Sequence, residues 1–326
     1  MADIIANWLA QASSIHTRRA YATSVLVFEE TQGITWSDAT AAHVNAFRRA
    51  LLDAGLKHST VALRIAALSS LFEYGIAAGV VVLNPCRHLR QRSRVRRYHS
   101  AHPLTEAQAQ ALLAACPVAT LSGARDYALM LTFLLTGWRS VEVLQLRWGD
   151  LEATPAADGS NGGISAIWAG KGDKHTVEPF PGVAFEGISF FLQLAGRWPP
   201  AATAYIWQPL NDRGCANLKN VTAPLASDRH ISPAQANRIL RKLLARTGMT
   251  AAQANTYSIH DLRHTFAHIC AENGVDPYRL QQLLHHEKLT TTLIYIDQMR
   301  RAVDDSASRL VASRLGVADR PARPVA

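Results

Sequence analysis

Three short stretches of this chain decide its fold. Residues 136–151 read TGWRSVEVLQLRWGDL, residues 258–268 read SIHDLRHTFAH, and residues 283–296 read LLHHEKLTTTLIYI. In the second stretch His260 and Arg263 stand one helical turn apart, so a helix would point both side chains into one site. Guanidinium groups offer a planar fork of donors to phosphate oxygens, so these stretches indicate a site for phosphate chemistry.

Together the three stretches resemble the tyrosine recombinase, or phage integrase, family. The resemblance covers Thr105 to Ile296, and the helical region before it is similar to that family's core-binding domain. It implies a mainly α fold with a small β-hairpin or sheet, in which two domains clamp DNA. We expect a helical, SAM-like core-binding domain over 1–86, a basic linker over 87–103, and a catalytic domain with a C-terminal helical tail over 104–326.

The family's catalytic residues are an arginine, a lysine, a His-x-x-Arg pair, a second histidine or tryptophan, and a tyrosine, always in that order. Each has a counterpart in this chain, and the lysine stands in GKGDK at residues 170–174. Carried over by position, the set is Arg139, Lys171, His260, Arg263, His286 and Tyr295.

The resemblance implies that Tyr295 attacks a DNA phosphate, giving a 3′-phosphotyrosyl link and a free 5′-hydroxyl. This link conserves the bond energy, so a partner strand can attack it in turn and no ATP is needed. Arg139 and Arg263 suit the charge that builds on the phosphate oxygens, because guanidinium stays protonated. Because the pKa of a phenol is ordinarily about 10, a base must help, and His260 is the candidate, with Lys171 as the acid for the leaving oxygen.

Three more residues belong to the predicted site. His286 is expected to donate a hydrogen bond to the phosphate, and Glu142 resembles the acidic residue that orients the family's first arginine. His285 departs from the family pattern, which commonly has glycine there, so the free choice of φ is lost. Either the turn needs no positive φ, or His285 rather than His286 faces the site.

A metal site is the alternative use of the histidines. His260, His264 and His268 follow at intervals of four on one helix, a spacing that can bind zinc. No HExxH motif is present, no carboxylate completes an obvious set, and HxLRH is the family's usual wording. We therefore expect neither a metal nor any other cofactor.

Helical patterns dominate the first 86 residues. Val61, Ile65, Leu68 and Phe72 fall on one face of a predicted helix, and Gly79 is its stop signal. By itself this pattern predicts a helical module of any function.

The segment after Asn84-Pro85 is strongly basic and has no acidic residue up to Pro103. Dense like charges repel one another, which favours an extended segment along phosphates. A solvated hinge is the alternative. The predicted DNA-binding residues here are Arg87, Arg90, Arg92, Arg94, Arg96 and Arg97.

The catalytic region alternates helices with one hairpin. Thr105 opens a helix through a capping box, and Pro117 ends it. Residues 127–135 are apolar nearly all round, as in a central buried helix. Alternating runs over 164–169 and 175–180 predict the hairpin.

A further helix is predicted from Ser232, its N-cap, to Gly248 just beyond its end. One face is apolar and the other basic, which fits a core on one side and a DNA groove on the other. A solvated basic face is the alternative. The apolar stripe holds Ile239, Leu240, Leu243 and Leu244, and the predicted DNA-binding face holds Arg238, Arg241, Lys242 and Arg246.

After Tyr295 the chain predicts one amphipathic helix that Gly316 ends. In the resembled family such a tail packs into a neighbouring protomer and links four subunits around two DNA sites, so we expect a homo-tetramer on paired sites. A tail that folds back on its own domain is the alternative. The apolar face holds Val303, Ala307, Leu310, Val311 and Leu315.

Composition agrees with a DNA-binding protein. The net charge is +9 and the pI about 9.7, which makes polyanions plausible partners. The four cysteines stand far apart without a CxxC pair, which indicates reduced thiols.

There is no basic n-region, and no apolar run approaches the roughly 18 residues of a membrane span. We expect a cytoplasmic protein that binds no membrane.

The combined patterns predict a site-specific DNA recombinase that acts on a double-stranded site with inverted repeats, for integration, excision or resolution of a DNA element. A type IB topoisomerase is the enzyme alternative, and the helical first domain favours recombination over it. A catalytically silent DNA-binding protein is disfavoured because the chemical set is complete. The helical region begins almost at Met1, so we expect no arm-binding domain ahead of it.

Overall fold

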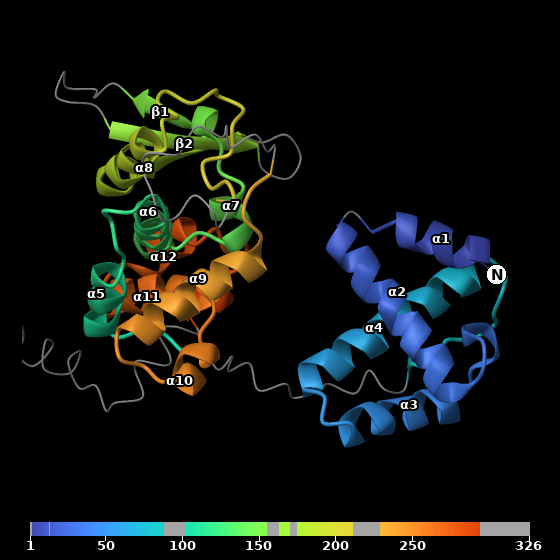
Figure 1. Cartoon of the computed structure of the whole chain (residues 1–326). Helices are drawn as coiled ribbons and strands as arrows, with labels where there is room; N and C mark the ends of the chain where they lie inside the picture. Colours follow the sequence, from blue (N-terminus) through green and yellow to red (C-terminus); the bar gives the residue numbers. More distant parts are fainter. Residues whose placement is uncertain are drawn as a thin grey trace, which may run out of the picture. The chain divides into compact units, whose positions relative to one another are not determined.

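The computed structural model describes residues 2–12, 14–87, 102–154, 163–169, 175–210 and 229–293. The chain divides into two compact units, Met1–His99 and Ser100–Ala326 (Figure 1). The first is all helical in its described part, and the second combines helices with one small sheet. The predicted mainly α fold with a small sheet is therefore confirmed, while the domain boundaries at 86 and 104 stay predictions.

In the described part of the first unit, four helices pack around an aromatic core. Phe28 meets Phe47 edge-on with ring centroids 5.2 Å apart, and Trp36 meets Phe72 at 5.6 Å. The α4 stripe predicted from Val61 to Phe72 faces this core, although Ile65 is only partly buried. The elements are α1 (Ala2–Ala10), α2 (Ile15–Gln32), the 3₁₀ turn η1 (Trp36–Asp38), α3 (Ala41–Asp53) and α4 (His58–Ala77).

Helix α4 bears on the expectation that no apolar run approaches the length of a membrane span. It has 20 residues with a hydropathy of 1.3 over its most apolar window, so by length and composition alone it could cross a membrane. Leu68, Leu71 and Phe72 on this helix are buried against α2 and α3 within the first unit. A core helix meets the same test of length and composition, and this packing accounts for its apolar residues.

The second unit is built around α6 (Leu121–Thr136), which the sequence predicted as a central buried helix. Leu129, Met130 and Phe133 are fully buried there, and the helix contacts α8 (Gly182–Leu194) and α11 (Ile259–Glu272) (Figure 1). The other helical elements are α5 (Glu106–Ala114), α7 (Ser140–Leu144), the 3₁₀ turn η3 (Trp148–Asp150), α9 (Pro233–Arg246), α10 (Ala251–Thr256) and α12 (Pro277–Leu283).

An antiparallel sheet in the order β1-β2-β3 lies beside these helices. The predicted hairpin is confirmed as β2 (Gly163–Ala169) and β3 (His175–Phe180), in a register that pairs Ala166 with Glu178. The strand β1 (Leu151–Thr154) was not predicted, because its four alternating residues are the shortest run that indicates a strand and only Leu151 among them is buried.

The predicted capping signals are confirmed at both helix starts. Thr105 accepts from the Gln108 N–H at the start of α5, and Ser232 accepts from the Gln235 N–H at the start of α9, where Pro233 is the first helical residue. Leu240, Leu243 and Leu244 of α9 are buried in the core.

Candidate active site

The site begins where α6 gives way to α7. Gly137 ends α6 with a φ of 63°, a left-handed conformation that glycine adopts without penalty. A Cβ at this position would lie 2.2 Å from Cδ1 of Phe266 on α11, so the close approach of α6 and α11 also requires glycine. The chain then turns through the buried Trp138 and presents the exposed Arg139 as the N-cap of α7.

Glu142 holds Arg139 from the first turn of α7. Its Oε2 accepts from the Arg139 backbone N–H at 2.6 Å, and its Oε1 accepts from Nη1 of the guanidinium at 2.9 Å. Burial would raise the pKa of this carboxyl, but contacts with His285 and Arg139 outweigh burial and lower its pKa from 4.5 to about 2. Glu142 is therefore ionised throughout the neutral range, and it contacts the arginine that the sequence analysis expects it to orient.

Arg263 approaches the same place from α11. Ser258 caps this helix, and its backbone N–H and hydroxyl both donate to the Asp261 carboxylate at 2.8 Å. The Arg263 side chain is almost fully buried, and its Nη1 donates to the Gly137 carbonyl at 2.9 Å. Its Nη2 donates to the Leu284 carbonyl. His260, one turn earlier, is exposed, and its ring contacts that of His264 with centroids 4.6 Å apart.

A turn after α12 completes the site. The His286 N–H donates to the Gln281 carbonyl at 3.1 Å and the His285 N–H donates to the Gln282 carbonyl at 2.9 Å, which together form a Schellman motif. In this motif the residue after the C-cap takes a left-handed conformation, usually as glycine. Here it is His285, with a φ of 50°. Of the two alternatives that the sequence left open, the one in which this turn needs no positive φ is therefore wrong, because the two capping hydrogen bonds require it.

Both arginines bind this turn. Arg139 Nη2 donates to the His285 carbonyl at 2.7 Å, and Arg263 donates to the preceding carbonyl, that of Leu284. In the sequence, Arg139 lies more than a hundred residues before the carbonyl that it binds, and Arg263 lies twenty-one residues before its own acceptor. The two cations thus meet beside the turn that carries His286.

His286 lies in the electrostatic field of these cations. Burial lowers its pKa, and the charges of Arg263 and Arg139 lower it further, from 6.5 to about 4. Its Nδ1 is 2.9 Å from the hydroxyl of the buried Thr292. When that hydroxyl donates, the neutral ring carries its proton on Nε2, where it can serve as a hydrogen-bond donor.

His285 instead directs its ring to two carboxylates. Its Nδ1 is 3.6 Å from Glu142 Oε1, and its Nε2 is 2.6 Å from Glu178 Oε1 on β3. Burial would lower its pKa, but pairing with Glu142 and Glu178 prevails and raises the pKa from 6.5 to about 9. The two histidines therefore differ at neutral pH, since His285 is charged and His286 is neutral.

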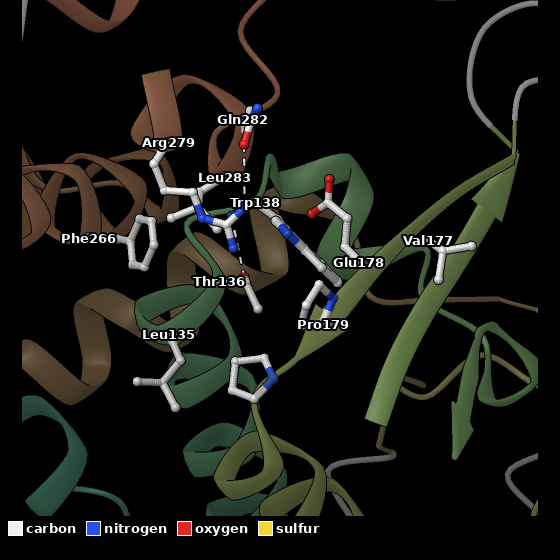
Figure 2. A pocket seen from close by; sticks show the side chains of 11 residues that line it. Leu135, Thr136, Trp138, Val177, Glu178, Pro179, Phe266, Arg279, Gln282 and Leu283 are labelled. Atoms are coloured by element: carbon white, nitrogen blue, oxygen red, sulfur yellow. Dashed lines mark hydrogen bonds between the residues drawn. The ribbon is translucent and has the colours of Figure 1, made fainter. Parts of the chain in front are cut away.

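A cavity of about 350 Å³ lies next to this cluster (Figure 2). Trp138, Phe266 and Glu178 line it together with Arg279 and Gln282 of α12. Figure 2 shows Glu178 of β3 beside Trp138, with Arg279 of α12 also at the cavity. The cavity is thus bounded by the end of α6 and the turn after it, by α11, by α12 and by β3.

The predicted DNA-contacting residues divide into two groups. Arg238, Arg241, Lys242 and Arg246 are exposed on the side of α9 away from its buried leucines, as predicted. The first three line a hollow of about 480 Å³ that also includes Ala251 and Asn255 on α10. Of the linker arginines, Arg87 pairs with Glu73 on α4 at 3.2 Å, and both side chains are exposed.

The remaining predicted positions lie outside the described residues. These are Lys171, Tyr295, the linker arginines Arg90, Arg92, Arg94, Arg96 and Arg97, and the tail helix over 303–315.

Sequence reasoning missed Glu178 and Thr292, which contact the site histidines from β3 and from the segment after the turn. Glu178 stands in no motif, and Thr292 lies within the stretch 283–296 as one of three consecutive threonines, so nothing in the sequence distinguished it as the partner of His286. No group of three His, Cys, Asp or Glu side chains suited to a metal occurs among the described residues, and His268 pairs instead with Glu272 at 3.1 Å.

Burial raises the pKa of the Cys86 and Cys116 thiols to about 12, which marks them as unreactive core residues.

The helical first unit and the arginine–histidine cluster of the second unit can be compared with those of known protein families. The phage integrase family model matches residues 102–301, and the model of the phage integrase N-terminal SAM-like domain matches residues 7–79. The chain belongs to the phage integrase family, whose members are the tyrosine recombinases. The predicted resemblance is therefore confirmed.

Individual relatives are similar along most of the chain. Tyrosine recombinase XerC of Vibrio atlanticus strain LGP32 is 28% identical over 287 residues, which are 86% of this chain and 82% of the relative. Tyrosine recombinase XerC of Mycobacterium sp. strain JLS is 29% identical over 311 residues, 92% of this chain and 94% of the relative.

Solved structures share the fold. XerH recombinase in a post-cleavage complex with palindromic difH substrate has a TM-score of 0.67 and 19% identity, over 92% of this chain and 81% of that chain. A lambda integrase dimer on a COC′ core site has a TM-score of 0.63 and 16% identity, over 93% of this chain and 79% of that chain.

Proposed function

We propose that this protein is a site-specific DNA recombinase that cleaves and rejoins DNA strands through a 3′-phosphotyrosyl intermediate. One observation carries the proposal: Arg139 and Arg263, from separate elements, converge on the turn that presents His286. Displacement at a phosphodiester places negative charge on the nonbridging oxygens, and preorganised cations and N–H donors stabilise that charge. The XerC and XerH relatives, named as recombinases, support the same reaction class.

Each basic residue then has a distinct task. Arg139, held by Glu142, turns its fork toward one phosphate oxygen, and Arg263 supplies a buried charge behind the turn. Neutral His286 donates from Nε2 to the phosphate, with Thr292 fixing its tautomer. A bound phosphate also offsets the field of the arginines, so binding of DNA raises the pKa of His286 from its low value and strengthens this hydrogen bond.

The covalent step belongs to Tyr295, with His260 as base and Lys171 as acid toward the leaving 5′-hydroxyl. The tyrosine oxygen forms a bond to phosphorus as the bond to the 5′-oxygen breaks, and the proton from Lys171 goes to that oxygen. A second 5′-hydroxyl then reverses the step on a partner strand. The exposed cationic face of α9 and the basic linker hold the duplex by its phosphates.

The expected assembly is a homo-tetramer on two sites with inverted repeats, inside the cytoplasm, without metal or cofactor. A type IB topoisomerase would use the same bond chemistry on one strand. The family's N-terminal SAM-like domain over 7–79 favours strand exchange between sites.

Trapping of the covalent adduct tests the proposal. A duplex taken from the inverted repeats beside the protein's own element, nicked close to the cleavage position, releases the leaving fragment and traps the protein on the 3′ end. Wild type is expected to give a band that survives denaturing electrophoresis, whereas Tyr295→Phe binds the duplex and gives none. Tyr278→Phe is the matched control, because this exposed α12 tyrosine has no assigned task. Adduct formation by Tyr295→Phe would contradict the nucleophile assignment.

A further inference from the structure

His285 makes contacts that the family's catalytic set does not account for. Its ring lies between Glu142 of α7 and Glu178 of β3, at 3.6 Å and 2.6 Å, and the three side chains are only 17%, 22% and 21% exposed. At this depth water screens charges less than at the surface. We propose that His285 is a positioning residue whose ring ties strand β3 to helix α7 and thereby holds the Glu142 carboxylate against Arg139.

The backbone of His285 is costly to maintain without such contacts. A non-glycine residue with φ near +50° is strained, and such residues persist where the surroundings determine the conformation. Here the two Schellman hydrogen bonds, and the hydrogen bond that Arg139 donates to the His285 carbonyl, hold the backbone in this conformation. Glycine would avoid the strain but would leave Glu142 and Glu178 without the cation between them.

The ring and the carbonyl of His285 reach Arg139 by different routes. The carbonyl accepts from Nη2 directly, at 2.7 Å. The ring acts through Glu142, whose Oε1 also accepts from Arg139 Nη1 at 2.9 Å. Loss of the ring therefore loosens the carboxylate that orients the guanidinium, while leaving the carbonyl contact in place.

The charges around His285 make this tie sensitive to alkaline pH. The charged and titratable groups around it are Glu142 of α7, Arg139 at the N-cap of α7, Glu178 of β3, Arg263 of α11, which binds the adjacent Leu284 carbonyl, and its neighbour His286. Because the two carboxylates raise its pKa to about 9, its stabilisation is fully present below pH 6.5 and is lost as pH rises through about 9.

A double-mutant cycle between His285 and Glu178 tests the tie without DNA. The variants are His285→Asn, which tolerates a left-handed conformation but carries no charge, Glu178→Gln, and both together. The full chain of each variant is unfolded in urea, and hydrogen exchange in peptides from α7 and β3 monitors the unfolding. The four unfolding free energies together give the coupling between His285 and Glu178. We expect at least a tenfold coupling in the unfolding equilibrium constant at pH 7, which is about 1.4 kcal/mol, and loss of it at pH 10.

His268 and Glu272 provide the matched control pair. They lie 3.1 Å apart on α11 and are 34% and 47% exposed, so their cycle should show less than about threefold coupling. Additive effects of His285→Asn and Glu178→Gln at pH 7 would overturn the tie. So would an NMR titration of wild type in which the His285 ring loses its proton near pH 6.5, a measurement that needs no variant.

A second experiment addresses the reaction and rests on the proposed function. His285→Gly restores the glycine and relieves the strain but removes the imidazole. We expect it to bind the nicked duplex within twofold of wild type and to form the adduct at least tenfold more slowly. Wild-type rates in His285→Gly would show that the ring is not needed for positioning. Because the cycle uses no DNA, it remains decisive even if the recombinase assignment fails.

Discussion

Replacement of Gly137 by alanine should destabilise the catalytic unit and disorganise the site together. Two costs can be read from the structure. A left-handed φ of 63° costs an alanine about 1–2 kcal/mol. Its Cβ would also meet Phe266 Cδ1 at 2.2 Å, and overpacking of this kind costs about 1–3 kcal/mol. The expected loss of unfolding free energy is therefore about 2–5 kcal/mol.

The same substitution at Gly187 is the matched control. Gly187 lies within α8, and a Cβ there would stand 3.6 Å from its nearest neighbours, Ala128 Cβ and Leu131 Cδ2, which is ordinary contact. Gly187→Ala should stabilise the helix by about 0.5–1 kcal/mol. Urea unfolding of the full chain, followed by hydrogen exchange in peptides from α6, reports on the catalytic unit separately from the helical unit.

A second substitution separates the two costs at Gly137. Phe266→Leu removes the ring that the new Cβ meets, so the double variant should recover the overpacking part and keep the φ part. Adduct formation should fall in Gly137→Ala, because the Gly137 carbonyl accepts from Arg263 and the following residues place Arg139. A loss below about 1 kcal/mol in Gly137→Ala would refute the steric and conformational reasoning.

Three further outcomes are expected. Because the folded-state pKa of His286 is lowered to about 4, stability should fall as pH decreases from 6.5 toward 4, and His286→Gln should lack this loss in urea unfolding at a series of pH values. Lys242→Ala should weaken site binding and reduce the slope of log affinity against log salt by about 0.9, measured by fluorescence anisotropy; an unchanged slope would remove this residue from the phosphate contacts. Truncation after Gln298 should retain binding to a single site and abolish paired-site complexes in gel-shift assays, and undiminished pairing would exclude exchange of the tail between subunits.

Local signals explain what could be predicted from the sequence alone. The α9 helix has its cap, its proline and its stripe of leucines within fifteen residues, and these interactions are the same in any surrounding fold. Arg139, Arg263 and His286 could be named because each stands in a motif with its neighbours. The β2–β3 hairpin followed from alternation over two adjacent runs.

Only the tertiary structure decided what surrounds His285. The sequence left open whether this residue needed a positive φ and which of the two histidines faced the site. Its φ of 50° follows from the Schellman hydrogen bonds, and its charge follows from Glu142 and Glu178, both more than a hundred residues earlier in the chain. Periodicity reports which face of an element is buried, but it does not report which carboxylate of another element will meet that face. The protonation of His285 and His286 depends on such distant neighbours, so it is a property of the folded chain.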